Sequence, residues 1–558
     1  MKYIVVDSAE FTYPDQMEYL SSSDCVVVDA PRGGYATFQI LLSDLYSDFC
    51  KENWLPESIY NDPALLEQAR IGFPRKSNVS VKTDLAFTVE WYSLVPVTIE
   101  QNPFPSSEDF RPHFPERIAP YRVYDCLRPF DGTLDVGVGD GRDSETGICG
   151  FYGAIQVPKD AVPGKYSDFV NITVDEETVS IPLVLNIYKA VLPGETLTVI
   201  QHHSGETVAE YHNVEYGSDE YQVLDAAYVK ALRRMRQNMM AIGGVKTIEV
   251  EENKYKFDFS VMEETIRRRI SQGIKCFAGP AIGCRESWKK STINISHAIV
   301  DKTMRAMSYE AYLFLAQYLT ALNEMLERNG WIDRFIMEVQ DEPNAENATE
   351  FRALCGLVRK FVPGIRLMDA VNYVEIFGAL DILVPLNMEY DKYQAEIETL
   401  RNCGGEMWHY VCCGPRQESY INRFIDYALL ATRYLFWGNY KYNLSGYLHW
   451  AVARYQSGQD PFRLNCPEHR SADIVNILPS GDTHLLYPGE DGPWMSIRAE
   501  AQREGIEEYE MLCELAKTDK VKADELCAKV FRSFCDVEYD VKVFRTVRKE
   551  LLVALSEL

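Results

Sequence analysis

The chain divides near residue 192 into two segments with different hydrophobic patterns. Between about residues 78 and 190, apolar and polar positions alternate, and in 179–187 valine, isoleucine and leucine fill the odd positions. This period of two predicts strands with one buried face, and Pro182 favours an edge strand because proline cannot donate to a sheet. Similar segments lie at 87–91 and 169–174, and a further strand is predicted at 25–29. The pattern predicts an N-terminal β-sandwich.

After residue 192, short apolar segments alternate with segments of helical periodicity. The predicted strands are 197–200, 246–250, 274–278, 331–340, 365–368, 380–385, 407–412 and 444–450. Eight strands that alternate with helices are typical of a (β/α)8 barrel. An open doubly wound sheet is the alternative, but such a sheet normally carries a phosphate-binding glycine loop before a helix. The glycine cluster at 137–141 lies in the sandwich half and no helix follows it.

Several helices of this second segment have recognisable ends. Apolar residues at helical spacing continue from Tyr228 to Met239, and a helix is expected at 420–437. Ser260 to Glu263 form a capping-box pattern, and a helix from about 308 to 328 ends at Asn329-Gly330. We therefore predict an α/β protein with a β-sandwich at 1–192, a barrel at 193–505 and C-terminal helices at 506–558 packed on the barrel.

Composition narrows the classes of partner. The 558 residues include 57 basic and 83 acidic side chains, a formal charge of −26 that repels nucleic acid and anionic membranes. No segment reaches the roughly 18–20 apolar residues of a membrane span. The start lacks a signal-peptide pattern, and the 14 cysteines form no C-x-x-C pair. We expect a cytoplasmic protein without nucleic-acid or membrane partners, although a trimmed secreted protein would show the same pattern. The oligomeric state stays open.

Barrel enzymes carry their catalytic groups at the carboxyl ends of strands, and the fourth predicted strand ends in acidic residues. Alternation places Glu338, Gln340 and Glu342 on the face toward the barrel axis, with Asp341 at the bend before Pro343. Two adjacent carboxylates raise the pKa of one another, which provides a general acid beside an ionised partner. The alternative is that Asp341 and Glu342 cap the following helix.

Most glycosidases need a second carboxylate across the scissile bond, often at the seventh strand. In the seventh predicted strand the only carboxylate is Glu406, at the opposite end. Glu389 and Asp391 follow the sixth strand, so an ordinary retaining glycosidase with Glu389 as nucleophile is one alternative. The missing carboxylate instead favours a substrate that supplies its own nucleophile. A carbohydrate-binding protein without catalytic activity is a third possibility.

Other polar and aromatic residues at strand ends are candidates for sugar contacts. They are His203, Asn372, Asn387, Trp408, Tyr410 and Trp450. Aromatic rings stack on sugar faces, and amides or imidazoles bind hydroxyl groups. The His202-His203 pair lacks metal-ligand spacing and there is no H-E-x-x-H motif, so we predict no metal and no cofactor.

Three motifs resemble those of glycoside hydrolase family 123. They are Asp-Glu-Pro at 341–343, Trp-His-Tyr at 408–410, and the late segment with Leu-Tyr-Pro-Gly at 486–489, Ser-Ile-Arg-Ala-Glu at 496–500 and Arg-Glu-Gly-Ile-Glu-Glu-Tyr-Glu at 503–510. The resemblance spans roughly residues 160–515, is strongest in the late segment and barely touches the first 150 residues. We interpret the late segment as structural, with an ion pair between Arg498 and Glu500.

The resemblance implies a β-N-acetylgalactosaminidase built as a β-sandwich followed by a barrel. Such enzymes retain configuration because the 2-acetamido oxygen of the substrate attacks C1 and forms an oxazolinium intermediate. By resemblance, Asp341 holds the acetamido N–H, and Glu342 protonates the leaving oxygen and then activates water. The expected activity is that of an exo-acting β-N-acetylhexosaminidase that prefers terminal β-linked GalNAc on an oligosaccharide or glycoconjugate.

Overall fold

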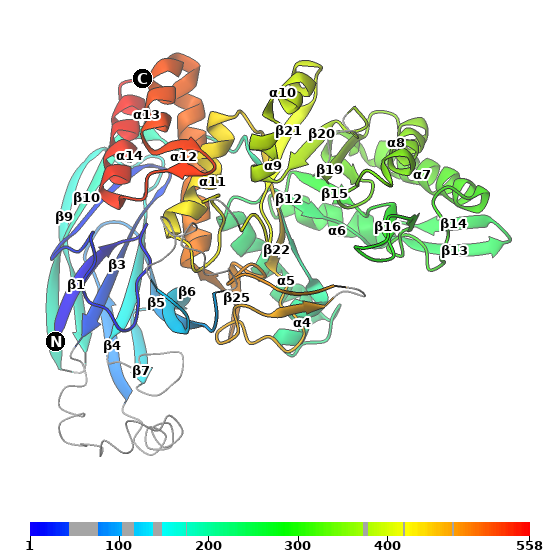
Figure 1. The fold of residues 1–558 in the computed structure, drawn as a ribbon. Helices are drawn as coiled ribbons and strands as arrows, with labels where there is room; N and C mark the ends of the chain where they lie inside the picture. The colour runs from blue at the N-terminus through cyan, green and yellow to red at the C-terminus, as the bar shows by residue number, and fades with distance from the viewer. Residues whose placement is uncertain are drawn as a thin grey trace.

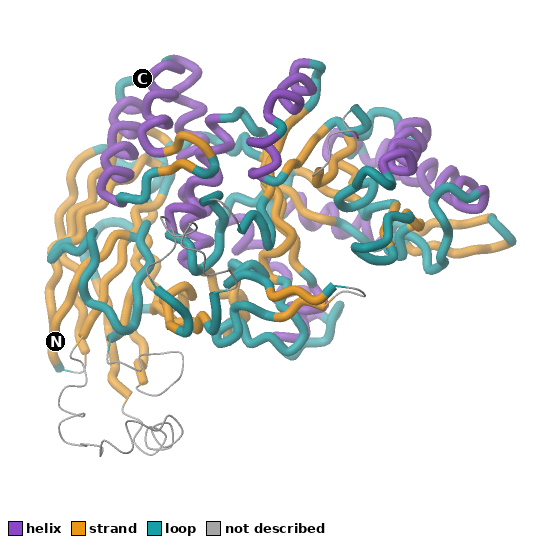
Figure 2. The backbone as a smooth tube through the Cα atoms, in the orientation of Figure 1, coloured by secondary structure: helices purple, strands orange, loops and turns teal. Residues whose placement is uncertain are grey.

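The protein combines a β-sandwich with a closed β-barrel and a group of C-terminal helices (Figure 1). The structure is a computed structural model that describes residues 1–43, 76–102, 117–137, 148–174, 176–371, 376, 378–416, 419–470 and 474–558. The sandwich and the barrel lie side by side, and the C-terminal helices pack both against the sandwich and against the helix at 429–441 of the barrel half (Figure 2). The predicted fold class is therefore confirmed.

The sandwich consists of two antiparallel-rich sheets. The first has the order β1 (Lys2–Asp7), β3 (Tyr35–Ser43), β8 (Cys149–Gln156), β5 (Val89–Ile99), β6 (Tyr121–Phe130), β26 (Gly492–Ser496) and β25 (Leu486–Gly489). The second has the order β2 (Val26–Arg32), β10 (Glu177–Val191), β9 (Gly164–Val174), β4 (Lys76–Lys82) and β7 (Thr133–Gly137). Apolar side chains from both sheets form one core, among them Phe38, Phe151, Ile172 and Leu183.

The alternating segments fall on these strands, with one correction. The segments 25–29, 87–91 and 169–174 lie on or at the start of β2, β5 and β9. The predicted edge position of Pro182 is wrong, because β10 lies between β2 and β9. Proline is tolerated there because pairing with β2 begins one residue later, at Leu183 and Val26. Of the glycine cluster at 137–141, only Gly137 lies within the described residues, where it ends β7.

The barrel closes with eight strands joined by parallel pairings. They are β11 (Thr198–His203), β12 (Met239–Ala241), β15 (Cys276–Gly279), β18 (Phe335–Glu338), β19 (Arg366–Val371), β20 (Ile382–Pro385), β21 (Glu406–Tyr410) and β22 (Gly446–Ala453). This closed barrel excludes the open doubly wound sheet. Its interior is filled by apolar side chains such as Met239, Ile336, Met368 and Trp408, so ligands meet the barrel at its strand ends.

The second barrel strand differs from the prediction. The segment 246–250 forms β13 (Lys246–Glu251), which pairs with β14 (Lys254–Asp258) in a hairpin outside the barrel. The strand is instead β12, whose residue Met239 continues the apolar spacing of the preceding helix. Because β12 has only three residues, periodicity cannot separate it from the helix that ends at Arg234.

The helices of the barrel half are α4 (Gly205–Tyr211), α5 (Asp219–Arg234), α6 (Ser260–Ser271), α7 (Tyr309–Asn329), α8 (Ala348–Phe361), α9 (Asn387–Lys392), α10 (Gln394–Asn402) and α11 (Leu429–Lys441). The limits of α7 are confirmed: Ser308 caps its start, and Gly330, at a φ of 67°, ends it. The capping box at Ser260 is wrong, because the cap residue is Phe259, which makes no side-chain cap bond. The helix expected at 420–437 begins only at Leu429.

Short elements complete this half. They are the hairpin β16 (Gly283–Arg285) and β17 (Ile293–Ile295), the 3-10 turn η2 (Ile332–Arg334) and the hairpin β23 (Glu468–Arg470) and β24 (Val475–Ile477). The strand expected at 331–340 is therefore shorter, with η2 before β18 and an irregular strand end after Glu338. This irregular end carries the acidic residues of interest.

The C-terminal part consists of α12 (Ile497–Thr518), α13 (Lys520–Val530), the hairpin β27 (Phe531–Ser533) and β28 (Asp536–Val537), and α14 (Val541–Ser556). Of the late segment, residues 486–489 form β25, Ser496 ends β26, and the rest lies buried on α12, where Arg498 contacts Asp125 at 2.9 Å. The predicted Arg498–Glu500 pair is wrong: Glu500 contacts Arg503 at 2.8 Å, since neighbours on a helix face lie three or four residues apart. The domain boundaries stay predictions, and β26 pairs with β6 across one of them.

Candidate active site

The acidic strand end of β18 lies at the carboxyl end of the barrel. Phe335, Met337 and Val339 pack in the core outside the barrel, whereas Ile336 belongs to its interior. The predicted alternation is therefore present, and it directs Glu338 inward. Glu338 is half-buried and Asp341 is exposed, as expected where the interior opens toward solvent.

Hydrogen bonds from a neighbouring strand hold this strand end. One carboxyl oxygen of Asp369, on β19, accepts the backbone N–H groups of Val339 and Gln340, both at 3.1 Å. The side chain of Gln340 accepts from Asn347 at 3.1 Å and donates to the carbonyl of Asp341. These contacts satisfy the buried backbone after regular pairing ends and fix the direction in which the next residues leave the barrel.

Glu342 has an unusual backbone and a specific partner. Its φ is +48°, in the left-handed region that non-glycine residues seldom adopt. Such a conformation costs about 1–3 kcal/mol and concentrates at functional sites. The hydroxyl of Tyr410, at the end of β21, donates to a carboxyl oxygen of Glu342 at 2.6 Å. The contact joins the ends of β18 and β21, and it was not predicted, because the sequence suggested Tyr410 only as a residue that contacts the sugar.

Asp341 lies between acidic and basic groups. Although the Asp341 side chain reaches solvent, the protein around it removes part of its hydration. This desolvation and then the charge of Glu342 raise the pKa of Asp341 to about 6, against the opposing charges of Arg285 and Arg454. Arg285 also donates to the carbonyl of Asp341 at 3.4 Å. Near neutral pH, Asp341 is therefore mostly ionised and stands beside a second carboxyl group.

The capping alternative does not match this geometry. The cap residue of α8 is Asn347, and the N–H of Asn344 donates to its side chain at 2.8 Å. Neither Asp341 nor Glu342 occupies that position. The pair is therefore free to act at the barrel mouth.

Trp450, in the second half of β22, is oriented by a buried acid that the sequence did not reveal. Its indole N–H donates to Asp482 at 3.0 Å, and the other oxygen of Asp482 lies 3.3 Å from His449. Burial and then the nearby Cys413 raise the pKa of Asp482 to about 8. Asp482 follows no strand of the barrel, so the sequence pattern did not indicate that it lies near the active site. Asp369, Arg285 and Arg454 were also missed, although a charged residue inside the apolar β19 was a visible sign.

The four remaining predicted residues are His203, which ends a barrel strand, Trp408 and Asn387, which are buried, and Asn372. His203 ends β11 near Arg454, and burial lowers its pKa to about 4, so it is neutral. Trp408 is fully buried and donates to Glu406 at 2.8 Å, so it packs within the barrel in place of the predicted sugar contact. Asn387 is also fully buried and donates to the carbonyl of Ile421 at 3.0 Å, which assigns it to the scaffold. Asn372 lies outside the described residues.

Neither carboxylate after the sixth strand is joined to the Asp341–Glu342 pair by a contact in the described part of the chain. Glu389, on α9, contacts Lys392 at 3.5 Å. Burial raises the pKa of Asp391 to about 6, and Tyr420 opposes this by a hydrogen bond. The ordinary retaining alternative therefore gains no support from these contacts.

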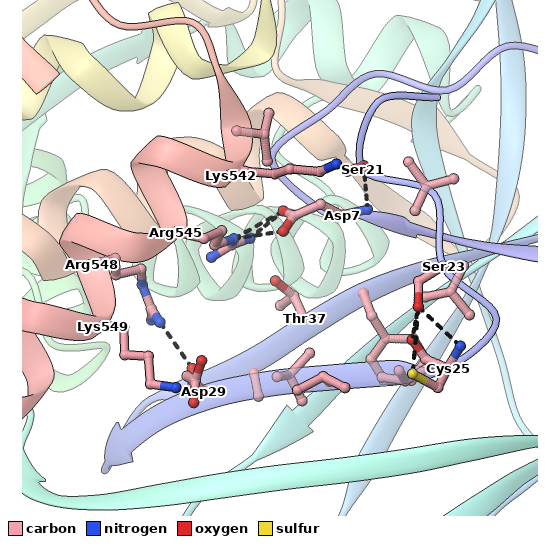
Figure 3. A pocket seen from close by; sticks show the side chains of 18 of the residues that line it. Asp7, Ser21, Ser23, Cys25, Asp29, Thr37, Lys542, Arg545, Arg548 and Lys549 are labelled. Atoms are coloured by element: carbon pink, nitrogen blue, oxygen red, sulfur yellow. Dashed lines mark hydrogen bonds and ion pairs between the residues drawn. The ribbon is translucent and has the colours of Figure 1, made fainter. Parts of the chain in front are cut away.

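A separate cavity of about 320 Å³ lies between β1, β2, β3 and α14, away from the barrel mouth (Figure 3). Its charged walls are largely paired internally: Arg545 contacts Asp7 at 2.6 Å, and Arg548 donates to the carbonyl of Asp29 at 2.9 Å. No strand end of the barrel lines it. The barrel mouth therefore remains the candidate active site.

The described residues contain neither a cluster of metal ligands nor a membrane-spanning helix. No group of three or more His, Cys, Asp or Glu side chains there is arranged to hold a metal ion. None of the helices described has the length and apolar character needed to span a membrane. The predicted cytoplasmic location is not tested by these findings and stays a prediction.

One solved structure shares the fold of this chain. The solved structure of a family 123 glycoside hydrolase from Clostridium perfringens, analysed for glycolipid glycan hydrolysis, is similar with a TM-score of 0.70 and 14% identity, over 100% of this chain and 97% of that one. A β-D-glucuronidase from Dictyoglomus thermophilum has a TM-score of 0.34 and 11% identity over 90% of this chain and 97% of its own. No curated protein matches significantly.

The sequence itself matches one family. The profile of the glycoside hydrolase 123 catalytic domain matches residues 202–515, which is more than half of the chain. This range contains all eight strands of the barrel except the first four residues of β11, and it contains the acidic strand end of β18. The chain therefore belongs to glycoside hydrolase family 123 and is a glycosidase.

Proposed function

We propose that the protein is an exo-acting β-N-acetylhexosaminidase that prefers terminal β-linked GalNAc and retains configuration through the 2-acetamido group of the substrate. The observation that carries the proposal is the position of Asp341 and Glu342 together at the barrel mouth. Across the mouth, β21 ends in Tyr410 and not in a carboxylate, since Glu406 lies at its other end and contacts Arg366 at 2.7 Å. A second acid suited to act as nucleophile is therefore missing from that strand.

In the first step, the acetamido oxygen of the substrate attacks C1 while the bond to the leaving oxygen breaks. Glu342 gives its proton to that oxygen, and an oxazolinium ring forms. Asp341, ionised near neutral pH, accepts the acetamido N–H and stabilises the positive charge that develops on the ring. The hydrogen bond from Tyr410 holds the Glu342 carboxyl in place.

In the second step, water attacks C1 and the oxazolinium ring opens. Glu342, now ionised, takes a proton from the water as general base and returns to its starting state. The sugar leaves with the same anomeric configuration as in the substrate, because two displacements have occurred at C1. The two carboxyl groups thus have different tasks although they are neighbours in the chain.

The substrate class follows from the same chemistry. The similar enzyme from Clostridium perfringens was analysed on glycolipid glycans, which supports an oligosaccharide or glycoconjugate substrate with a terminal amino sugar. Trp450, held by Asp482, and His203 supply an aromatic face and a neutral imidazole for sugar contacts. No cofactor is required by either step.

Three aryl glycosides test the proposal directly. We expect turnover of aryl β-GalNAc to be fastest, aryl β-GlcNAc to be slower, and aryl β-galactoside to be cleaved hardly at all, because it lacks the acetamido nucleophile. Hydrolysis of the galactoside at the rate of the amino sugars would refute substrate assistance. A covalent fluorosugar adduct on Glu389 would instead establish the ordinary retaining mechanism, and sugar binding without any hydrolysis would indicate a binding protein.

A further inference from the structure

Glu338 is a carboxyl group at the site that the proposed mechanism leaves without a task. It is the last residue of β18, two positions after Ile336, whose side chain lies in the barrel interior. Its side chain is half-buried. Among the described residues, it has no hydrogen-bond or ion-pair partner. A polar group placed in this way on the floor of a mouth can be satisfied by a bound ligand.

The groups that act on Glu338 from the elements around it are acidic. Asp341 lies on the segment after β18, and Asp369 lies on β19. Burial and then the charge of Asp341 raise the pKa of Glu338 to about 8. Burial and then Glu338 also raise the pKa of Asp369. The cations Arg285 and Arg454 act on Asp341.

Protonation gives Glu338 a property that its neighbours lack. Asp369 accepts two backbone N–H groups with one oxygen and so is committed to the strand end. Asp341 is ionised near neutral pH and can only accept hydrogen bonds. A protonated Glu338 carries an O–H donor, and it avoids a further negative charge in the crowded space beside Asp341.

We propose that Glu338 is a further substrate-contacting residue, a neutral carboxylic acid on the floor of the barrel mouth that donates a hydrogen bond to the sugar held by Asp341 and Glu342. The inference rests on the proposed function and deepens it. The hydroxyl and amide oxygens of a sugar are suitable acceptors for such a donor. A neutral acid that donates a hydrogen bond at an active site is a known solution where carboxyl groups crowd one another.

The test compares Glu338→Gln with Glu338→Leu on an aryl β-GalNAc that has a good leaving group, so that kcat/KM does not depend on a proton from Glu342. Glutamine keeps an N–H donor and a neutral charge, and we expect kcat/KM within about threefold of the wild type. Leucine removes the donor, and we expect a loss of about tenfold. Glu346→Gln, at an exposed position on the following loop, is the matched control and should change neither value.

The pH dependence provides a readout that a purely structural role would not move. With the same substrate, wild-type kcat/KM should fall as the pH rises through about 8, because Glu338 then loses its proton beside Asp341. The Glu338→Gln variant should stay level over that range. The infrared difference between wild type and this variant at pH 7 should contain the C=O stretch of one protonated carboxylic acid.

Each outcome decides the inference. Full activity of Glu338→Leu, an unchanged alkaline limb in Glu338→Gln, or no carboxylic-acid band would overturn it while leaving the glycosidase intact. If Glu338→Leu fails to fold, the pH profile and the infrared band of Glu338→Gln still decide. If the wild type hydrolyses no acetamido sugar, the proposed function fails first and the inference fails with it.

Discussion

Carboxyl groups that the protein shields from bulk water occur in two regions of the molecule, and their partners differ. On α12, Glu500 contacts Arg503 at 2.8 Å and Arg234 at 2.6 Å. Burial alone would raise the pKa of Glu500, but these guanidinium groups outweigh burial and lower it. At the barrel mouth, the charge of Asp341 adds to burial and raises the pKa of Glu338 to about 8. The charge of Glu342 acts in the same way on Asp341, whose pKa rises to about 6.

The comparison shows that burial by itself does not identify an active site. In both regions the protein removes part of the hydration of the carboxyl groups, but of these two regions only the mouth leaves them able to change protonation near neutral pH. The α12 acids are fixed as ions by arginine and serve to join helices. The mouth acids crowd one another, and that is the arrangement that acid–base chemistry requires.

The largest expected effect comes from removing the proton donor at the mouth. Glu342→Gln keeps the size of the side chain and its contact with Tyr410 but cannot transfer a proton. On a β-GalNAc with a poor leaving group, kcat should fall about 10²–10⁴-fold, which is the usual value of general acid assistance. Steady-state kinetics measure this, and an activated aryl substrate should show a smaller loss. An undiminished rate on the poor substrate would assign Glu342 to the scaffold.

Whether a helix or strand of the fold could be predicted from the sequence depends on the length of that element. The long helix α7 and the alternating strand β10 were predicted because many residues repeat their pattern. The three-residue strand β12 was missed, since its apolar residues extend the spacing of α5. The pattern at Ser260 located the start of α6 but not its cap, because the cap residue is Phe259 and makes no side-chain cap bond.

The residues of the site also differ in whether the local sequence pattern or only the tertiary fold reveals their position. Asp341, Glu342 and Tyr410 could be placed at the mouth because strand ends are readable from the local pattern. Trp408 looked equivalent but lies deeper, where Gly446 on the next strand leaves room for its ring. Asp482 comes from a loop far along the chain, so only the fold brings it to Trp450.

Breaking the ion pairs of α12 should damage stability and leave the chemistry alone. Glu508 contacts Arg433 at 2.5 Å, with both side chains almost completely buried. Glu508→Ala leaves that guanidinium without this partner and should lower the free energy of unfolding by about 3–5 kcal/mol. Urea unfolding measures the loss, and kcat of the folded enzyme should not change.

The same helix offers a matched control. Glu514 contacts Lys517 at 2.5 Å, but both side chains are largely exposed. Glu514→Ala should therefore change the free energy of unfolding by no more than about 1 kcal/mol. Equal losses of unfolding free energy in the two variants would show that burial does not increase the contribution of the Arg433–Glu508 pair to stability.

Mild acid should separate the two regions without any mutation. Asp341, whose pKa is about 6, must be ionised to stabilise the oxazolinium, so kcat/KM should fall about tenfold per pH unit below that value. The lowered pKa of Glu500 in the folded state means that its stabilising contribution is lost only as the pH falls through that lower value. Between pH 6 and 5, activity should therefore decline while circular dichroism stays constant. Asp341→Asn, already slow, should lack this acid limb.

The smallest effect is expected at the residue that joins the two strand ends. Tyr410→Phe removes the hydroxyl that donates to Glu342 at 2.6 Å and keeps the ring. Loss of one hydrogen bond to a carboxyl group that is not otherwise displaced should lower kcat about tenfold, with little change in KM because the phenol acts on the acid and not on the sugar. Stability should hardly move, since Glu342 remains accessible to water. A large rise in KM with an unchanged kcat would instead show that Tyr410 binds the sugar directly. Tyr410 would then belong with Trp450 among the residues that recognise the substrate, and not with the acid–base pair.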